Sequence, residues 1–321
     1  MLPSSLTQRI LQRFPGKLTY CFAYGSGVKK QTGYDDKAQK DAMIDLVLCV
    51  DDAFEWHKEN LQKNPRDYSW MRFLGSKIIA EYQEYAAGVY CNTLIPIDKH
   101  VTIKYGVIRT QDLSDDLYHW PHLYVAGRLH KPVETLIEPN DELKNDLAKN
   151  FESAVHAALL QLPERFTYFE LFHAIANISY NGDFRMLFGE KKDKVKNIVE
   201  PQLDAFLKLY KPYLRNMSHC VHIPDLSKVC DTRIEQTKSH DTILAHLEAL
   251  PTRVQKLLNE ITQVPLSELA QKPDYDTQVK TAIGVINWDN SFAQTLKNIP
   301  TAGVFKAIKY GAKKALKTFS K

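Results

Sequence analysis

The most constraining segment of this chain is residues 43–50, MIDLVLCV, which places a single carboxylate, Asp45, inside an otherwise apolar run. Apolar and β-branched residues at the remaining positions predict a strand that is buried on both faces. A charged side chain in such a strand is unfavourable unless it is paired or binds a metal ion. We therefore expect a strand of a central sheet whose Asp45 belongs to a functional site.

A second strand-like run precedes this segment and ends in glycine. Residues 18–28, LTYCFAYGSGV, predict a strand that stops at Gly25, Ser26 and Gly27, and a polar loop then leads to residue 43. Glycine lets the backbone approach a phosphate closely, and amides together with the Ser26 hydroxyl can bind its oxygens. The stretch nevertheless lacks the GK[ST] ending of a P-loop and the third glycine of a dinucleotide fingerprint.

Together the two runs resemble the nucleotidyltransferase signature, in which Gly-Ser ends one strand and a metal-binding acid lies on the next. In that superfamily the acids hold magnesium against a nucleoside triphosphate. A second acid usually follows two residues after the first, on the same strand face, but this chain has Val47 there. The missing carboxylate must come from elsewhere, and the candidates are Asp51, Asp52, Asp115 and Asp116.

The remaining pattern divides the chain into four parts. Strand and helix signals alternate up to residue 135, which predicts an α/β nucleotidyltransferase-like domain with a mixed sheet and a hairpin over residues 88–110. Residues 136–215 predict a mainly helical domain, with the winged helix as a candidate fold, and Thr167 with Glu170 forms a capping box. A helical or irregular connecting region follows at 216–300, with one helix over 240–261. Residues 301–321 predict a basic amphipathic helix.

The N-terminal segment is also unusual, because residues 1–34 contain no Asp or Glu while Arg9, Arg13 and Lys17 are spaced along it. Such a start is typical of a mitochondrial targeting helix. An ordinary amphipathic first helix capped by Ser5 explains it equally well. Elsewhere, apolar runs are far shorter than the roughly 18 to 20 residues that cross a bilayer, and five cysteines without CxxC spacing favour reduced thiols.

Six blocks in order carry a longer resemblance: FAYGSGV, MIDLVLCVDD, AAGVYCN, IKYGVI, LYVAGRLHKPV and ISYNGDFRM. They resemble the mitochondrial phosphatidate cytidylyltransferase family, also called the translocator assembly and maintenance protein family, densely over residues 18–215. The resemblance implies magnesium-dependent transfer of CMP from CTP to phosphatidic acid, which gives CDP-diacylglycerol and pyrophosphate and feeds cardiolipin synthesis. It also implies a peripheral protein at the matrix side of the anionic inner mitochondrial membrane.

The resemblance further implies roles for single residues of the sheet domain. Tyr24 and the turn at Gly25, Ser26 and Gly27 would contact the CTP phosphates, and Asp45 would bind Mg²⁺ and act in catalysis. For the supplementary metal carboxylate we expect Asp116 first and Asp52 second. Both acids have an alternative interpretation as surface or capping residues.

Cations are needed as well, since a triphosphate keeps excess negative charge after magnesium binding. Arg128 and Lys131, in AGRLHKPV, are predicted to contact the nucleotide and to assist catalysis, whereas His130 between them is expected to be structural. Phosphatidate is already an anionic nucleophile, so the transfer has little need for a general base. Tyr180, Asp183 and Arg185 are predicted at the lipid headgroup or phosphate, with a purely structural Asp-Arg pair as the alternative.

The last 21 residues contain six lysines and no acid. Their spacing places apolar residues on one helical face, with membrane contacts expected from Phe305, Lys306, Lys309 and Lys313. A basic amphipathic helix of this kind binds anionic membrane surfaces. A helix that packs on the protein itself is the alternative.

Two other functions stay open at this stage. One is a nucleotidyltransferase with a different acceptor, such as RNA or a small molecule, and the other is a non-catalytic assembly factor for mitochondrial import. The basic tail favours a lipid acceptor, so no nucleic-acid partner is expected. A carboxylate inside an apolar strand, such as Asp45, has no use in a scaffold. The sequence leaves the oligomeric state open.

Deletion of residues 301–321 is expected to weaken binding to anionic liposomes and to leave CTP binding unchanged. The lysines and the apolar face would be lost while the predicted nucleotide site remains. Sedimentation with liposomes and equilibrium binding of labelled CTP measure the two effects. Unchanged sedimentation of the truncated chain would reject the tail as a membrane-binding element.

Overall fold

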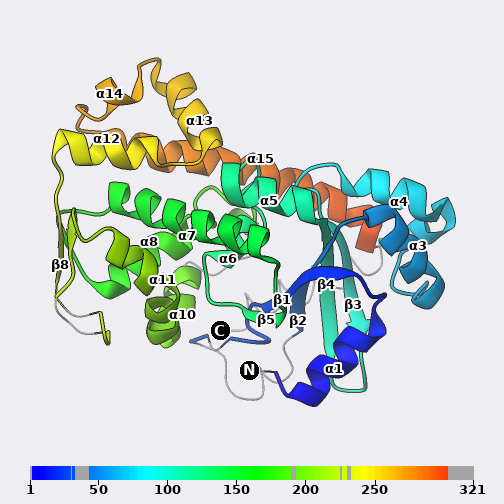
Figure 1. Cartoon of the computed structure of the whole chain (residues 1–321). Coiled ribbons are helices and arrows are strands. Elements are labelled where there is room, and N and C mark those ends of the chain that lie inside the picture. The colour runs from blue at the N-terminus through cyan, green and yellow to red at the C-terminus, as the bar shows by residue number, and fades with distance from the viewer. Residues whose placement is uncertain are drawn as a thin grey trace.

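The computed structural model describes residues 2–29, 31–32, 43–188, 193–224, 226–229 and 233–302. These residues form a sheet-containing lobe and a helical lobe, and one long helix runs along both (Figure 1). The sequence prediction of a mixed α/β first part followed by a mainly helical part is confirmed at this level.

The first lobe is built on a five-stranded mixed sheet in the order β3-β4-β2-β1-β5. Its strands are β1 (Leu18–Tyr24), β2 (Ile44–Val50), β3 (Tyr90–Pro96), β4 (Thr102–Arg109) and β5 (Glu134–Ile137). β2 is parallel to β4 and antiparallel to β1, and β3 and β4 form the predicted antiparallel hairpin. β5 pairs with β1, so this lobe includes residues slightly beyond the boundary expected at 135.

Side-chain alternation along β2 gives the two faces of the sheet different neighbours. Val47 and Cys49 join a core that is shared with the helical lobe. Leu46 and Leu48 face the other way and pack in a second core beneath α1 (Ser4–Arg13) and α3 (Ala53–Lys63). Asp45 shares the face of Val47, so its carboxylate is on the side of the sheet where the helical lobe lies.

Helix α1 is part of the first lobe. It begins after Pro3 without a side-chain cap, so the expected Ser5 cap is wrong, because Ser5 already lies inside the helix. Its apolar face is buried, with Ile10 fully inaccessible. The Lys63 Nζ atom donates hydrogen bonds to the carbonyl oxygens of Gln12 and Phe14 at its end. These contacts give α1 a structural role within the fold.

The remaining elements of the first lobe surround the sheet and lead into the second. The 3-10 helix η1 (Trp70–Leu74) and α4 (Gly75–Gln83) lie near β3, while α5 (Thr110–His119) and α6 (Ala126–Leu129) follow β4. The helix predicted over residues 71–85 is therefore two elements. Gly75, at φ +85°, lies between them and changes the chain direction.

The helical lobe contains α7 (Asp141–Gln161), α8 (Tyr168–Asn177), α9 (Arg185–Phe188), α10 (Lys194–Val199), η2 (Glu200–Gln202) and α11 (Leu203–Asn216). The predicted capping box is confirmed, since Thr167 and Glu170 each bond the other's backbone N–H. A small sheet, ordered β6-β8-β7, joins β6 (Arg165–Phe166), β7 (Val221–His222) and β8 (Ile234–Gln236). This sheet carries the lobe past the boundary expected at residue 215.

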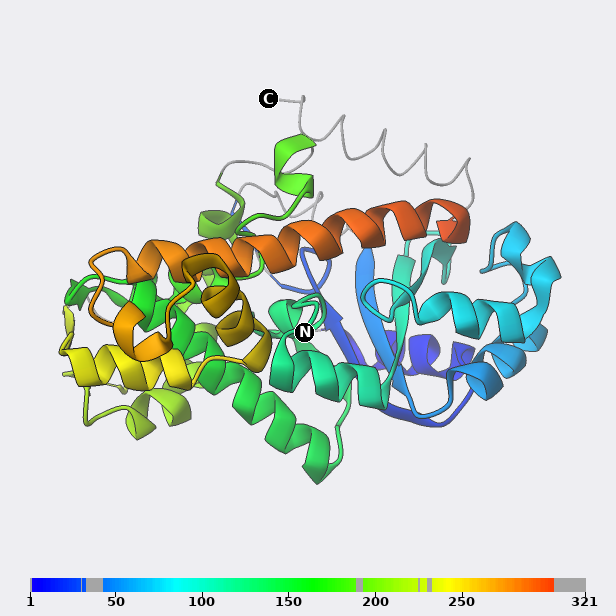
Figure 2. The ribbon, with the colours of Figure 1, turned by 90° about the horizontal axis from the view of Figure 1, so that it is seen from above.

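Residues 240–302 differ from the expected connecting region. The single helix predicted over 240–261 is two, α12 (His240–Glu248) and α13 (Thr252–Thr262), because Pro251 ends the first and precedes the second. After α14 (Leu266–Leu269) comes α15 (Tyr275–Ala302), a helix of 28 residues where the sequence pattern predicts only a helical or irregular connection. It extends along both lobes (Figure 2).

Two further findings concern the cysteines and the possibility of membrane-spanning helices. Cys21, Cys49, Cys91 and Cys220 are free and buried, in agreement with the expected reduced thiols. None of the helices that the structure describes is both long and apolar enough to cross a bilayer.

We predict that acid destabilises this fold, because burial lowers the pKa values of four histidines from 6.5, to about 4 in His57 and His246 and to about 3 in His130 and His156. Below pH 6.5 the unfolded chain takes up protons that the folded chain does not. The free energy of unfolding is therefore highest above pH 6.5 and falls toward pH 4. Between pH 7 and pH 5 it falls by about 2 kcal/mol per histidine. Urea unfolding at the two pH values measures this loss.

Replacement of one histidine gives the control. His57→Gln is expected to reduce the loss between pH 7 and pH 5 by about 2 kcal/mol, whatever it does at pH 7. His119→Gln, at an exposed position, is expected to leave the loss unchanged. An unaltered loss in His57→Gln would show that His57 is already protonated in the folded protein.

Candidate active site

The site begins where β1 ends in the glycine turn. Gly25 has φ +81°, a left-handed conformation that favours glycine. Its carbonyl oxygen accepts hydrogen bonds from the amides of Val28 and Lys29, which closes one tight turn. A Cβ added to Gly27 would lie 2.6 Å from the carbonyl oxygen of Met43, so only glycine fits there. The turn is thus packed closely against the start of β2.

Asp45 lies beside this turn. It pairs across the sheet with Tyr24 of β1 and lies in register with Lys104 of β4. A Cβ added to Gly25 would be 3.2 Å from Oδ2 of Asp45, so the glycine keeps the space next to the carboxylate open. The sheet therefore brings together the glycine turn, a carboxylate and a lysine on its helical-lobe face.

Arg128 of α6 reaches this group from the other lobe. Its Nε donates to the Tyr24 hydroxyl at 3.1 Å, and its Nη1 donates to the carbonyl oxygen of Tyr124. The guanidinium carbon lies 3.8 Å from the centroid of the Tyr124 ring, within the range of a cation–π contact. Tyr24 and Arg128, both predicted at the nucleotide, are thus in direct contact.

Asp116 holds the loop that precedes α6. Its Oδ1 accepts from the amides of His122 (3.2 Å) and Leu123 (2.7 Å), and its Oδ2 accepts from those of Val125 (2.8 Å) and Ala126 (3.0 Å). Four hydrogen bonds occupy the lone pairs that a metal ion would need. The observed contacts therefore favour a structural role for Asp116 over the predicted metal role.

The buried side chain of Asn150 also holds α6 in place. The Asn150 Oδ1 atom accepts from Trp120 Nε1 at 2.8 Å and lies 3.0 Å from His130 Nε2. His130 is fully buried, and its lowered pKa keeps the ring neutral. The expectation that His130 is structural agrees with these contacts.

Lys131 follows on the same turn and points toward the helical lobe. Its Nζ donates to the carbonyl oxygen of Gly127 and, at 2.6 Å, to the hydroxyl of Ser179. Nζ also lies 5.1 Å from the ring centroid of Tyr180. Burial, followed by the neighbouring charges of Arg128 and Arg185, lowers the pKa of Lys131 to about 7.

Asp183 and Arg185 form the predicted ion pair. Arg185 Nε lies 3.0 Å from Oδ1 and its Nη2 lies 2.5 Å from Oδ2, which gives a bidentate arrangement. Burial alone would raise the pKa of Asp183, but the hydrogen bonds and charge of Arg185 lower it instead. Asp183 is buried, whereas about a third of the Arg185 side chain is exposed. The ion pair thus stabilises the turn, as the structural alternative expects, and it still leaves the Arg185 guanidinium partly exposed.

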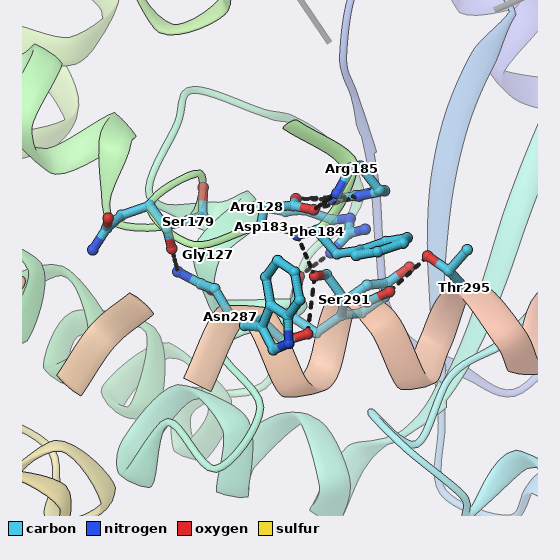
Figure 3. A network of polar contacts seen from close by, with 12 residues as sticks. Gly127, Arg128, Ser179, Asp183, Phe184, Arg185, Asn287, Ser291 and Thr295 are labelled. Atoms are coloured by element: carbon cyan, nitrogen blue, oxygen red, sulfur yellow. Dashed lines mark hydrogen bonds and ion pairs between the residues drawn. The ribbon is translucent and has the colours of Figure 1, made fainter. Parts of the chain in front are cut away.

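Helix α15 braces the turn that carries this pair (Figure 3). Asn287 Nδ2 donates to the carbonyl oxygens of Ile178 (2.6 Å) and Asn181 (2.7 Å), and the Phe184 amide donates to Ser291 Oγ at 2.8 Å. Figure 3 shows Arg128 beside Asp183 and Arg185, above these α15 side chains. Arg185 therefore belongs to the same cluster as the α6 cations.

Asp52 cannot share a metal ion with Asp45. It caps α3, where its Oδ1 accepts from the amide of Glu55 at 3.0 Å. Seven residues along an extended strand separate it from Asp45, which is roughly 20 Å. Asp51 lies at the same far end and accepts from the Thr110 hydroxyl, and Asp115 accepts from Gln111. Val47 is buried in the shared core.

A magnesium ion fits the remaining donor set only as an ion shared with substrate phosphates. Mg²⁺ commonly binds one or two carboxylates and completes its shell with water and phosphate oxygens. Asp45 supplies a partly exposed carboxylate beside the glycine turn. Within the described ranges, no group of three or more His, Cys, Asp or Glu side chains is arranged to hold a metal.

Several residues of this cluster were not singled out from the sequence. Lys104, Tyr124, Ser179, Asn287 and Ser291 all contribute, and Lys194 acts electrostatically on Lys131. The alternation of side chains along the predicted strand IKYGVI could have indicated that Lys104 faces the same side of the sheet as Asp45. The others come from segments distant in sequence. The predicted membrane residues Phe305, Lys306, Lys309 and Lys313 lie outside the described residues.

The chain is similar to known proteins over both of its lobes. A sequence profile described as "Phosphatidate cytidylyltransferase, mitochondrial" matches residues 7–317. Proteins of that name from Drosophila melanogaster, Danio rerio and Mus musculus are 45%, 43% and 42% identical to this chain. The alignments cover 98%, 97% and 96% of this chain and 99%, 93% and 92% of the relatives. The similarity thus spans both lobes.

We predict that inorganic triphosphate binding takes up a proton near pH 8. Lys131, with a pKa of about 7, is mostly neutral there, and a bound polyanion favours its charged form. Affinity should therefore fall as pH rises above 7, by up to about tenfold per pH unit. Calorimetry in buffers of different ionisation enthalpy measures the uptake. Lys131→Arg stays charged and should remove it, and an uptake that persists in this variant would contradict the assignment.

Proposed function

This chain belongs to the mitochondrial phosphatidate cytidylyltransferase family, and we propose that its reaction takes place between the glycine turn of β1 and the cations of α6. The chain is an enzyme that makes CDP-diacylglycerol from CTP and phosphatidate. The observation that carries the proposed location is the convergence of Arg128, Lys131 and Arg185 next to Tyr24 and Asp45.

In this reaction a phosphate oxygen of phosphatidate attacks the α-phosphorus of CTP. A new phosphorus–oxygen bond forms, the bond between the α-phosphorus and the bridging oxygen to the β-phosphorus breaks, and pyrophosphate leaves with the bonding electrons. The nucleophile is already an anion at neutral pH, so no proton has to be removed. The buried neutral His130 supports this, because it is held by Asn150 and is not available as a base.

The protein's contribution is therefore positioning and charge neutralisation. We propose that the turn at Gly25, Ser26 and Gly27 receives the triphosphate, with Arg128 and Lys131 on its oxygens. Arg185, oriented by Asp183, would contact the phosphate group of phosphatidate, with Tyr180 beside Lys131 at the same end. Two anionic substrates would otherwise repel each other strongly, so a surplus of fixed cations is needed where they meet.

Magnesium is proposed as the cofactor, with Asp45 as its protein ligand. The ion would supply further neutralisation of the phosphate oxygens and help orient them for displacement. Asp45 would fix the triphosphate at the end of β1 in this way. The Asp116 carboxylate, by holding the loop before α6, would set the position of Arg128 from the opposite side.

The cellular setting is also a proposal. The relatives are named mitochondrial, and we propose a peripheral location on the matrix side of the inner membrane, with the product entering cardiolipin synthesis. The order α7, β6, α8, α11, β7, β8 and the sheet order β6-β8-β7 support a winged-helix arrangement for the helical lobe. A different acceptor, or a non-catalytic import role, stays the alternative that an assay must exclude.

Asp45→Asn is expected to lower CDP-diacylglycerol formation by at least about a hundredfold without unfolding the chain, because the variant loses the metal carboxylate. Asp52→Ala is the matched control. It removes a helix cap and costs about 1 kcal/mol of stability, but it lies at the far end of β2 and should retain activity. The assay uses labelled CTP, Mg²⁺ and phosphatidate in liposomes.

The outcomes separate the alternatives. Full activity of Asp45→Asn would refute the metal role, and equal losses in both variants would point to a shared folding defect. Label transferred to RNA instead of phosphatidate would favour the other acceptor. Absence of any transfer by the unaltered protein would favour the import role.

A further inference from the structure

The outer face of α15 changes character along its length. In the first half the exposed residues are polar, and Thr277, Lys280 and Thr281 are among them. From residue 290 to residue 299 the exposed residues are Phe292, Leu296 and Ile299. Trp288 begins this apolar row, and Asp289 is the exposed charge next to it. A helix on the surface of a protein normally shows the opposite pattern.

These four side chains form one continuous stripe. Trp288, Phe292, Leu296 and Ile299 are 44%, 42%, 52% and 46% exposed, and their spacing places them within one quarter of the helix circumference. The other side of the same segment is well packed, with Ser291, Gln294 and Lys297 buried. Contiguous apolar surface of this kind usually marks a binding surface. We call these four residues the α15 stripe.

The stripe continues onto a second element. Ser69 Oγ donates to the carbonyl oxygen of Pro300 at 2.6 Å, which joins the start of η1 to the end of the stripe. On η1, Trp70 is 53% and Phe73 77% exposed, and Leu74 follows. Arg72 lies over the Phe73 ring, with its Cζ 4.7 Å from the centroid. Tryptophan with flanking cations is typical of residues at a membrane interface.

The other end of the stripe reaches the candidate active site. The ring of Phe184 contacts Trp288 and Phe292, with centroid distances of 5.5 Å and 5.1 Å. Phe184 stands between Asp183 and Arg185 in the chain. The apolar surface thus begins one residue away from the guanidinium that is proposed to contact the phosphate group of the lipid.

We infer that the α15 stripe and η1 together bind to an anionic lipid bilayer and bring Arg185 to the membrane surface. Apolar side chains would enter the headgroup region, while Arg72 and Lys77, both exposed, would face anionic headgroups. The inference rests on the proposed function, because Arg185 gains a lipid phosphate only if phosphatidate is the substrate. It differs from the predicted tail contact, since it assigns membrane binding to residues of the folded lobes.

Charge and position favour a bilayer over a protein partner. Arg72 of η1, Lys77 of α4 and the cations of the site suit an anionic surface, and the chain after residue 302 continues with six lysines and no acid. A lipid with its phosphate at Arg185 would have its acyl chains beside Phe184 and the stripe. A second copy of this chain offers the same cations and would bring like charges together.

Tryptophan fluorescence tests this surface directly. Of the four tryptophans, Trp56 and Trp120 are buried at 4% and 0% exposure, whereas Trp70 and Trp288 lie on the proposed surface. Vesicles of brominated phosphatidylcholine mixed with phosphatidylglycerol, which is anionic but not the substrate, should therefore quench the fluorescence of the full chain. The double variant Trp70→Phe and Trp288→Phe should lose this quenching.

Binding energy is tested by a second pair of variants. Leu296→Ser with Ile299→Ser should reduce binding to phosphatidylglycerol vesicles by at least about tenfold. Ile261→Ser is the matched control, because Ile261 is 39% exposed on α13, away from the stripe. With a short-chain, water-soluble phosphatidate, the Leu296 and Ile299 double variant should turn over substrate like the unaltered protein.

Several results would overturn the inference. Vesicle binding without quenching would mean that another surface, such as the lysine-rich tail, makes the contact. The inference would also be rejected if the protein did not bind vesicles, or if the Leu296→Ser and Ile299→Ser double variant, here called the stripe variant, bound them as tightly as the unaltered protein. A dimer that the stripe variant converts to monomers would assign the surface to a second copy. Failure of the proposed function would instead abolish turnover and leave the quenching in place.

Discussion

The arrangement depends on α15 being hydrogen-bonded to both lobes. Toward the helical lobe, Asn287 bonds the carbonyl oxygens of Ile178 and Asn181, and toward the sheet, the buried ammonium of Lys297 donates to those of Gln83 and Tyr85. Lys297 therefore caps the C-terminal end of α4, where the helix dipole favours a cation. Burial lowers the pKa of Lys297 to about 8, so this contact weakens as the pH approaches that value. Together with the core that the two lobes share, this brace holds Arg185 against the sheet.

The site itself balances opposing charges across the boundary between lobes. Asp45 and Lys104 come from the sheet, whereas Arg128, Lys131 and Arg185 come from α6 and the turn after α8. Each cation is positioned by neutral partners, such as the Tyr124 ring and the Ser179 hydroxyl, or by one acid. The cluster thus keeps a positive surplus, which is unfavourable in the empty site and is relieved when a polyanion binds.

Short-range patterns were predicted well from the sequence. The β3–β4 hairpin, the strands on either side of the glycine turn and the capping box at Thr167 follow from local periodicity and hydrogen bonding, and the structure contains all of them. The α15 helix was predicted only as part of a helical or irregular connection, because buried residues on one side and apolar exposed residues on the other conceal the amphipathic period. The four amide partners of Asp116 could not be predicted, because they become its neighbours only when the loop folds back.

The sequence by itself determined the chemistry: a carboxylate in an apolar strand after a Gly-Ser turn, cations in the blocks LYVAGRLHKPV and ISYNGDFRM, and a family resemblance that the comparisons confirm. Only the tertiary structure decided which of these residues meet. Asp52 and Asp45 are close in sequence yet lie at opposite ends of an extended strand, whereas Tyr24 and Arg128 are distant in sequence and share a hydrogen bond. The reason is that strand geometry separates neighbours along the chain, while burial of the shared core brings distant segments together.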